Sequence, residues 1–205
     1  RVKKYVLEGR IELQGGMWVE SDTNLTGGES WIRQCLYGQK YWKDNFDFKS
    51  RMCWLPDVFG FPATLPQVLK KCGMDYFMTI KLTSNDFNRF PYRSFNWKGL
   101  DGTKLLSHME PLGDYNAGNS PLAIFKSEDR YSEKDICDKA LLIYGDGDGG
   151  GGPGEGHLEY MMRHKKNIDG LAPCKPSPAV NFFDDIKDMA DKLPTHEGEL
   201  YYERH

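Results

Sequence analysis

The sequence predicts an α/β fold in which a largely parallel sheet is flanked by helices. Segments typical of strands, at 51–55 and 75–82, alternate with segments of helical spacing at 29–46 and 63–72. A continuous apolar run at 140–144 is typical of a strand that is buried on both faces. Strands that alternate with helices favour a parallel sheet, because each crossover between parallel strands needs a connecting helix.

Local signals predict each element in turn. Over 29–46, apolar pairs recur close to the helical period, and the helix predicted over 63–72 ends at Gly73, a common C-terminal stop. The Asp101-Gly102 turn predicts a hairpin between its two flanking strands. The remaining predicted elements are strands over 11–19, 94–97 and 104–109 and helices over 154–164 and 182–193.

Composition excludes several classes of protein. The 205 residues include 27 Lys and Arg against 30 Asp and Glu, a net charge of −3, so the chain has no basic excess for nucleic acid. We expect no membrane span, because no apolar run approaches the roughly 18 residues that one needs. The five cysteines form no C-x-x-C pair, which disfavours a disulfide framework and a thiolate zinc site.

Two aspartates are placed where an α/β fold locates its chemistry. Asp57 follows the strand predicted over 51–55, and Asp148 lies in the glycine-rich segment 145–153 that follows the apolar run at 140–144. The carboxyl ends of parallel strands meet at one edge of the sheet, so the two carboxyl groups are expected to converge. Such a pair can cleave a glycosidic bond: one attacks and the other protonates the leaving oxygen.

Other interpretations of these residues stay open from the sequence. An aspartate after a strand is also a common helix N-cap. The aromatic residues Trp18, Trp54, Phe59 and Phe61 fit either a sugar-lined pocket or the hydrophobic core. A non-catalytic carbohydrate-binding module with aromatic platforms is therefore an alternative, although it has no need of the aspartate pair.

The glycine run also matches a dinucleotide-binding fingerprint. Gly145, Gly147 and Gly150 have the G-x-G-x-x-G spacing between a predicted strand and a predicted helix. A dinucleotide-dependent oxidoreductase is thus a further alternative. It is disfavoured because Asp146 and Asp148 would repel a pyrophosphate, which binds to unobstructed backbone N–H groups.

Several segments of the chain together carry a resemblance to a known family. They include WLPDVFGF at 54–61 and GDGDGGGGP at 145–153, and the likeness extends over 15–42, 54–73, 90–109 and 198–205. The sequence resembles glycoside hydrolase family 38, the zinc-dependent retaining α-mannosidases, especially the fungal vacuolar and animal cytosolic branch. The resemblance implies that residues 1–205 form a partial α/β catalytic domain, without its beginning and without the helical bundle and β-sandwich domains.

The resemblance also implies roles for single residues. Asp57 matches the catalytic nucleophile, which is also a zinc ligand, and Asp148 matches the general acid/base, with Asp146 as the alternative. Lys81 falls where the family places a basic residue beside the nucleophile. A stretch that includes Glu20 is implied to face the active site. The implied substrate-binding residues are Trp18, Asp22, Trp54, Phe59 and Asp146.

The expected zinc site is incomplete in this sequence. The H-x-D motif of the family is absent, and its last zinc histidine would lie beyond His205, so one of four expected ligands remains. A single carboxylate does not hold zinc tightly, so we expect this chain alone to be inactive. The resemblance implies a mannose-containing oligosaccharide as substrate, a homo-oligomeric full-length enzyme, and a cytoplasmic or vacuolar/lysosomal location.

Overall fold

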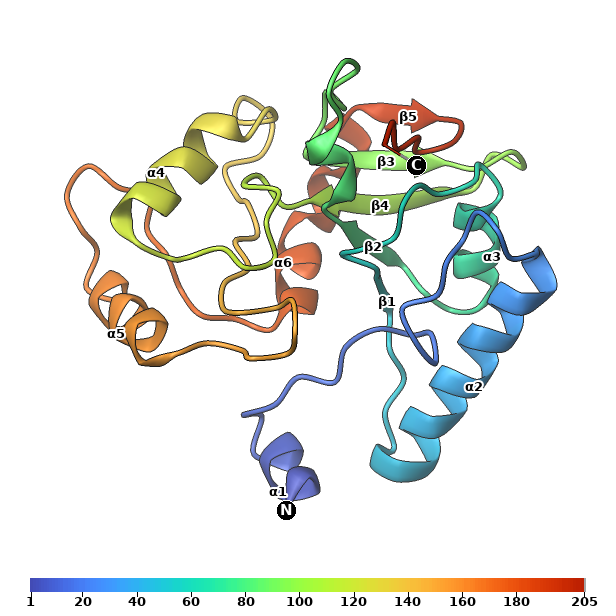
Figure 1. The fold of residues 1–205 in the computed structure, drawn as a ribbon, viewed down its shortest axis with the longest axis horizontal. Helices are drawn as coiled ribbons and strands as arrows, with labels where there is room; N and C mark the ends of the chain where they lie inside the picture. The colour runs from blue at the N-terminus through green and yellow to red at the C-terminus, as the bar shows by residue number, and fades with distance from the viewer. Residues whose placement is uncertain (205) are drawn as a thin grey trace.

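The computed structural model describes residues 1–204 and confirms the predicted α/β class (Figure 1). The sheet has five strands in the order β1-β2-β4-β3-β5. The pairs β1–β2, β2–β4 and β3–β5 are parallel, whereas β3 and β4 form the predicted antiparallel hairpin. The strands are β1 Met52–Trp54, β2 Tyr76–Thr79, β3 Ser94–Lys98, β4 Lys104–Met109 and β5 Thr195–Glu197.

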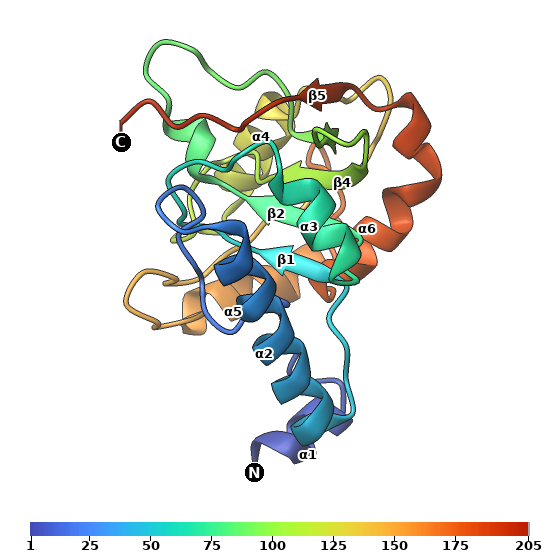
Figure 2. The same cartoon turned by 90° about the vertical axis from the view of Figure 1, so that its right-hand side faces the viewer.

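Helices lie on both faces of the sheet. Figures 1 and 2 show α2 and α3 on one side and α6 on the other, with α4 and α5 set apart beyond the sheet. None of the described helices is long and apolar enough to cross a membrane. The helices are α1 Val2–Leu7, α2 Gly28–Phe46, α3 Leu65–Lys71, α4 Pro121–Arg130, α5 Glu155–His164 and α6 Ala179–Ile186, and two 3-10 helices are η1 Lys81–Ser84 and η2 Lys187–Lys192.

The strands divide their side chains between two hydrophobic clusters. Successive strand residues point to opposite faces, so Cys53 and Phe77 pack with residues of α2 and α3. Their neighbours Met52 and Tyr76 pack on the other face with α6, where the Tyr76 ring stacks on Phe183 at 4.9 Å between centroids. Burial of both faces holds the sheet between its helical layers.

Two predicted strands are wrong. Residues 11–19 form no strand; the segment lies along α2, where the Trp18 N–H donates to the Gln34 carbonyl at 2.9 Å. Residues 140–144 also form no strand, although they are half-buried for the most part. Leu141 and Ile143 pack on the cluster that faces α6, so packing rather than sheet pairing buries this apolar run. No sequence pattern predicted α1, α4 or β5.

A close backbone contact fixes the segment that precedes α2. Gly38 lies in the middle of α2, and a Cβ there would be 2.5 Å from the carbonyl carbon of Met17. The absence of a side chain therefore allows residues 16–17 to lie directly on the helix. Trp42 strengthens the contact, because its indole N–H donates to the Gly15 carbonyl at 2.8 Å.

Candidate active site

The candidate site forms where β1, β2 and β4 end. Asp57 follows β1, Lys81 is the first residue of η1 after β2, and Tyr115 lies in the loop after β4. Because these three strands are mutually parallel, their carboxyl ends share one edge of the sheet. The three side chains meet there, although they are far apart in the sequence.

Asp57 and Lys81 form an ion pair in an aromatic surround. The Lys81 ammonium donates to Asp57 Oδ1, and the Tyr115 hydroxyl donates to the same oxygen at 3.3 Å. The Lys81 Nζ also lies over two rings, 4.9 Å from the centroid of Phe59 and 5.5 Å from that of Tyr115. Burial lowers the pKa of Lys81, but the hydrogen bond and charge of Asp57 outweigh it, so the pKa is raised overall.

Glu20 holds the backbone of Asp57. The Asp57 N–H donates to Glu20 Oε1, and partial burial, together with the nearby charge of Asp57, raises the pKa of the Glu20 carboxyl group. Two neighbours of Glu20 bind the same turn: the Thr23 hydroxyl donates to the Gly60 carbonyl at 2.9 Å, and Asn24 Nδ2 donates to that of Phe59 at 2.7 Å. The segment 20–24 thus fixes the turn that presents Asp57.

The glycine-rich loop folds back on itself. The backbones of Asp146 and Gly152 exchange hydrogen bonds of 2.9 and 2.7 Å, which close the loop between them. The loop does not fit the dinucleotide fingerprint, because the fingerprint glycines must follow a strand directly and residues 140–144 form no strand. The helix N-cap interpretation is also wrong, since Thr64 caps α3 and Gly154 caps α5.

The loop that carries Asp148 is attached beside Tyr115. The Asp148 N–H donates to Asn116 Oδ1 at 2.9 Å, and a Cβ at Gly147 would lie 2.6 Å from the Tyr115 carbonyl oxygen. The pKa of Tyr115 is raised chiefly by burial; Lys81 opposes this effect, and the charges of Asp57 and Asp148 add to it. Asp57 and Asp148 therefore both lie within electrostatic reach of one tyrosine.

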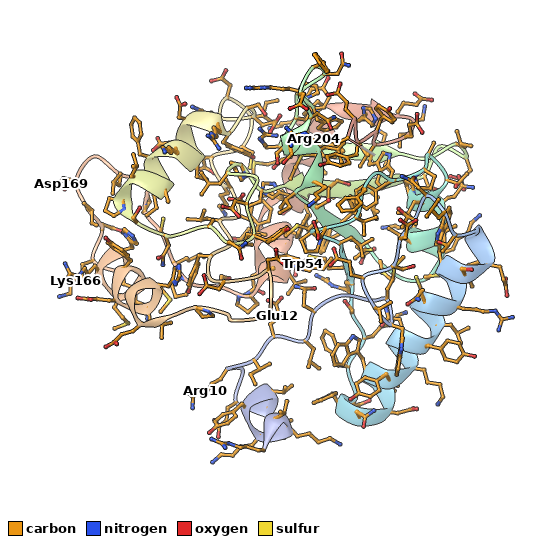
Figure 3. The ribbon with its side chains drawn as sticks, viewed as in Figure 1. Arg10, Glu12, Trp54, Lys166, Asp169 and Arg204 are labelled. Carbon is orange, nitrogen blue, oxygen red and sulfur yellow. The ribbon has the colours of Figure 1, made fainter. Side chains whose placement is uncertain are left out.

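The other predicted substrate-binding residues have varied surroundings. Trp18 is exposed and packs edge-on against Tyr41 of α2. The Asp22 carboxylate accepts the N–H groups of Asn24 and Leu25, at 2.9 and 2.7 Å, and so stabilises a turn. Trp54, labelled near the middle of Figure 3, is half-buried and packs on the cluster that faces α6.

The aromatic residues of the 57–61 turn separate into two environments. Phe59 is half-buried and stacks on Tyr202 with 5.6 Å between ring centroids, beside the Lys81 ammonium. Phe61 is buried in the core against Phe77 and Trp97, which excludes it from a sugar pocket. Of these two rings, Phe59 is the one that belongs to the candidate site.

One residue of the site, and one contact of another, were not predicted from the sequence. Tyr115 lies in an irregular loop without a periodic pattern or motif, so nothing in the sequence indicates its contact with Asp57. Glu20 was expected to face the site, but its bond to the Asp57 N–H depends on how the segment 20–24 folds onto the turn. Both contacts join segments that are remote in the chain.

The described residues do not assemble a zinc site. Within residues 1–204, no group of three or more His, Cys, Asp and Glu side chains is placed to hold a metal ion. Zinc in proteins normally has at least three protein ligands. Asp57 is accompanied by Lys81 and Tyr115 rather than by further ligands.

A family match and several relatives, all from glycosyl hydrolase family 38 or named alpha-mannosidases, cover most or all of the chain. The family description "Glycosyl hydrolases family 38 N-terminal domain" matches residues 1–199. The chain is 40% identical over 205 residues to alpha-mannosidase G of Dictyostelium discoideum, covering 100% of this chain and 19% of that protein. It is 40% identical over 199 residues to the alpha-mannosidase of Saccharomyces cerevisiae, covering 93% of this chain and 18% of that protein. It is 36% identical over 205 residues to human alpha-mannosidase 2C1, covering 100% of this chain and 20% of that protein.

Solved structures share the fold. An alpha-mannosidase from Enterococcus faecalis superposes with a TM-score of 0.77 at 18% identity, over 97% of this chain and 23% of that one. A 4-alpha-glucanotransferase from Thermococcus litoralis superposes with a TM-score of 0.56 at 13% identity, over 89% of this chain and 30% of that one. The chain spans about a fifth of the length of the curated relatives named above. On the family match and these identities, the chain belongs to glycosyl hydrolase family 38 and corresponds to its N-terminal domain.

Proposed function

We propose that this chain supplies the two catalytic carboxyl groups of a retaining α-mannosidase, which removes terminal α-linked D-mannose from oligosaccharides. The names of the relatives support the substrate, since three proteins at 36–40% identity are alpha-mannosidases. One observation carries the assignment of the site. The turn bearing Asp57 and the loop bearing Asp148 both meet Tyr115, although they are far apart in the sequence.

In the first step, Asp57 acts as the nucleophile. Lys81 and Tyr115 both bind Oδ1 of Asp57, so Oδ2 attacks C1 of the mannose and forms a glycosyl ester. The protonated carboxyl group of Asp148 gives its proton to the glycosidic oxygen as the bond from C1 to that oxygen breaks. The ion pair with Lys81 and the Glu20 contact hold Asp57 in the orientation that this attack needs.

In the second step, Asp148 acts as the base. Its carboxylate takes a proton from water while the water oxygen attacks C1, and the ester bond to Asp57 breaks. Two displacements at C1 retain the anomeric configuration. In retaining enzymes the two carboxyl groups lie about 5–5.5 Å apart in the productive state, and the same separation is expected here.

We propose further that the chain is part of a larger catalytic domain, with Asp57 as its one contribution to a zinc site. This rests on the share of each relative that the chain covers and on the lack of a three-residue metal cluster within residues 1–204. Zinc content after dialysis tests it: the isolated chain should retain less than one zinc per ten molecules, and the full-length enzyme about one. Tight zinc binding or mannosidase activity in the isolated chain would overturn this part.

We also propose that the full-length enzyme is a homo-oligomer that works in the cytoplasm or in a vacuole or lysosome. This proposal rests on the resemblance of the sequence to the fungal vacuolar and animal cytosolic branch of the family. Light scattering after size exclusion measures the mass of the full-length enzyme, and a monomer would contradict the first part. Cell fractionation tests the second part, and a secreted enzyme would contradict it.

Substitution of each carboxylate in the full-length enzyme tests the catalytic roles. Asp57→Asn should reduce turnover to background on all α-mannosides, whereas near-normal activity would reject Asp57 as nucleophile. Asp148→Asn should lose about 10²–10⁴-fold on substrates with poor leaving groups, and far less on activated aryl mannosides, which need no proton. An equal loss on both substrates would reject Asp148, and the same comparison for Asp146→Asn decides between the two aspartates. Asp188→Asn, in η2, is the matched control and should leave activity unchanged.

A further inference from the structure

A cavity rich in arginine adjoins segments of the candidate active site. It shares two segments with that site: η1, which begins with Lys81, and the loop after β4 that leads to Tyr115. The cavity has a volume of about 220 Å³. We call it the arginine pocket, and it is lined by Thr83, Arg89, Phe90, Arg93, Pro111, Leu112 and Arg130.

The three guanidinium groups of the arginine pocket form no direct ion pair in the described part of the chain, although the charges of Glu133 and Glu110 act on Arg93. Within residues 1–204, none of the described ion pairs includes Arg89, Arg93 or Arg130. The Nε of Arg93 is buried and has no hydrogen-bond partner in this part of the chain, while its Nη1 lies 3.8 Å from the Met109 sulfur. A buried, unpaired donor of this kind is costly, and it leaves the hydrogen-bonding capacity of Arg93 partly unused.

The nearby carboxyl groups accept hydrogen bonds from backbone N–H groups, while Oε1 of Glu110 is buried without a partner within residues 1–204. Glu133 accepts the backbone N–H groups of Arg93 and Ser94, at 3.0 and 2.8 Å. Glu110 accepts the Gly113 N–H at 2.7 Å, and burial raises its pKa to about 7, so near neutral pH it is charged only in part. Neither glutamate lines the cavity, so it presents three positive groups and no negative one to a ligand.

Tertiary contacts hold two of the arginines in place. Glu203 accepts the backbone N–H groups of Phe87 and Asn88, at 2.8 and 2.7 Å, which fixes the loop immediately before Arg89. Arg130 ends α4, and its Nη1 donates to the Leu112 carbonyl on the cavity wall at 3.0 Å. The Arg130 guanidinium and the backbone that precedes Arg89 are therefore positioned before a ligand arrives, which reduces the entropic cost of binding.

We propose that the arginine pocket binds a phosphate group. Guanidinium groups match tetrahedral oxyanions with paired, charge-assisted hydrogen bonds, and a phosphate monoester carries a charge of about −1.5 to −2 at neutral pH. The cavity is smaller than the roughly 300–1,000 Å³ of pockets for drug-sized ligands, so it suits a compact anion. The phosphate is either free inorganic phosphate or a group carried by a mannose residue bound in the adjoining site.

Calorimetric titration of the full-length enzyme with inorganic phosphate, at constant ionic strength, tests the proposal. We expect saturable binding to the wild type and a dissociation constant at least tenfold higher in Arg89→Gln and in Arg130→Gln. Both side chains are exposed, so these changes should leave the fold intact, as circular dichroism can verify. Arg33→Gln, on the exposed side of α2, removes the same charge elsewhere and should bind phosphate as the wild type does.

Titration with mannose 6-phosphate then distinguishes the two sources of the phosphate. A dissociation constant at least tenfold lower than that of inorganic phosphate assigns the pocket to a phosphorylated sugar, and equal constants assign it to free phosphate. Absence of saturable phosphate binding in the wild type, or undiminished binding in the Arg89→Gln/Arg130→Gln double variant, would overturn the proposal. Binding is measured without turnover, so the result is independent of whether the enzyme cleaves mannosides.

Discussion

Replacement of Gly38 by alanine should destabilise the protein, although alanine is the better helix former. An alanine Cβ would lie 2.5 Å from the carbonyl carbon of Met17 and 2.6 Å from the carbonyl oxygen of Gly16. Non-bonded carbon atoms settle at about 3.5–4.0 Å, so the backbone of residues 16–17 has to retreat by about 1 Å. The displaced segment continues directly into Glu20, which binds the Asp57 N–H.

The magnitude follows from three contributions. Overpacking of a close contact costs about 1–3 kcal/mol. The Trp18 and Val19 N–H groups now donate to Gln34 at 2.9 and 3.1 Å, and loss of one such hydrogen bond costs about 1 kcal/mol. Alanine regains about 0.5–1 kcal/mol of helix propensity. We therefore expect a net loss of about 2 kcal/mol, or roughly 4–8 °C in Tm for a domain of this size.

Urea unfolding and thermal melting, followed by tryptophan fluorescence, measure the effect. Gly156→Ala is the matched control: this glycine lies in α5, and a Cβ there would meet no atom within 4 Å. That variant should gain about 0.5–1 kcal/mol. A Gly38→Ala protein as stable as the wild type, or more stable, would refute the contact between α2 and residues 16–17.

Three further variants test the ion pairs and the tyrosine. Lys81→Met should cost about 1 kcal/mol of stability. Because Asp57 outweighs the effect of burial and raises the pKa of Lys81, urea unfolding should show this difference below pH 10.5 and its loss as pH rises further. A difference that does not depend on pH would contradict this prediction. Asp184→Asn should also cost about 1 kcal/mol of stability. The hydrogen bonds from Arg51 lower the pKa of Asp184, so the difference in stability between variant and wild type should be present above pH 3.8 and lost as pH falls below it. A stability difference that persists in acid would count against the ion pair. Tyr115→Phe should lower kcat/KM about fivefold, equivalent to one hydrogen bond of about 1 kcal/mol, and unchanged kinetics would exclude a role for the hydroxyl.

The sequence was informative where local signals decide the structure. The helix expected over 29–46 is α2, the hairpin around Gly102 is β3 and β4, and the strands expected over 51–55 and 75–82 contain β1 and β2. In each case periodicity, turn chemistry or β-propensity agrees with the tertiary structure. The contact between Asp57 and Lys81 was also expected, from the resemblance, and the structure places the two side chains together.

The loop that carries Asp148 reaches Tyr115 in a way that the sequence did not predict. A strand over 140–144 was expected to carry this loop to the sheet edge, and the structure has none there. Instead, Asn116 and the backbone next to Tyr115 hold the glycine-rich loop, through contacts between residues about 30 positions apart. Such contacts have no local signature, because they depend on how irregular loops pack at the end of the sheet.

The separation of the carboxyl groups of Asp57 and Asp148, in a crystal structure of the full-length enzyme with an unreactive mannoside bound, tests the central claim most directly. The account predicts that the two groups lie on opposite sides of C1, about 5–5.5 Å apart. A sugar that touches neither group would contradict it, and so would a separation of about 6.5–9.5 Å or more, because that is the spacing of inverting enzymes.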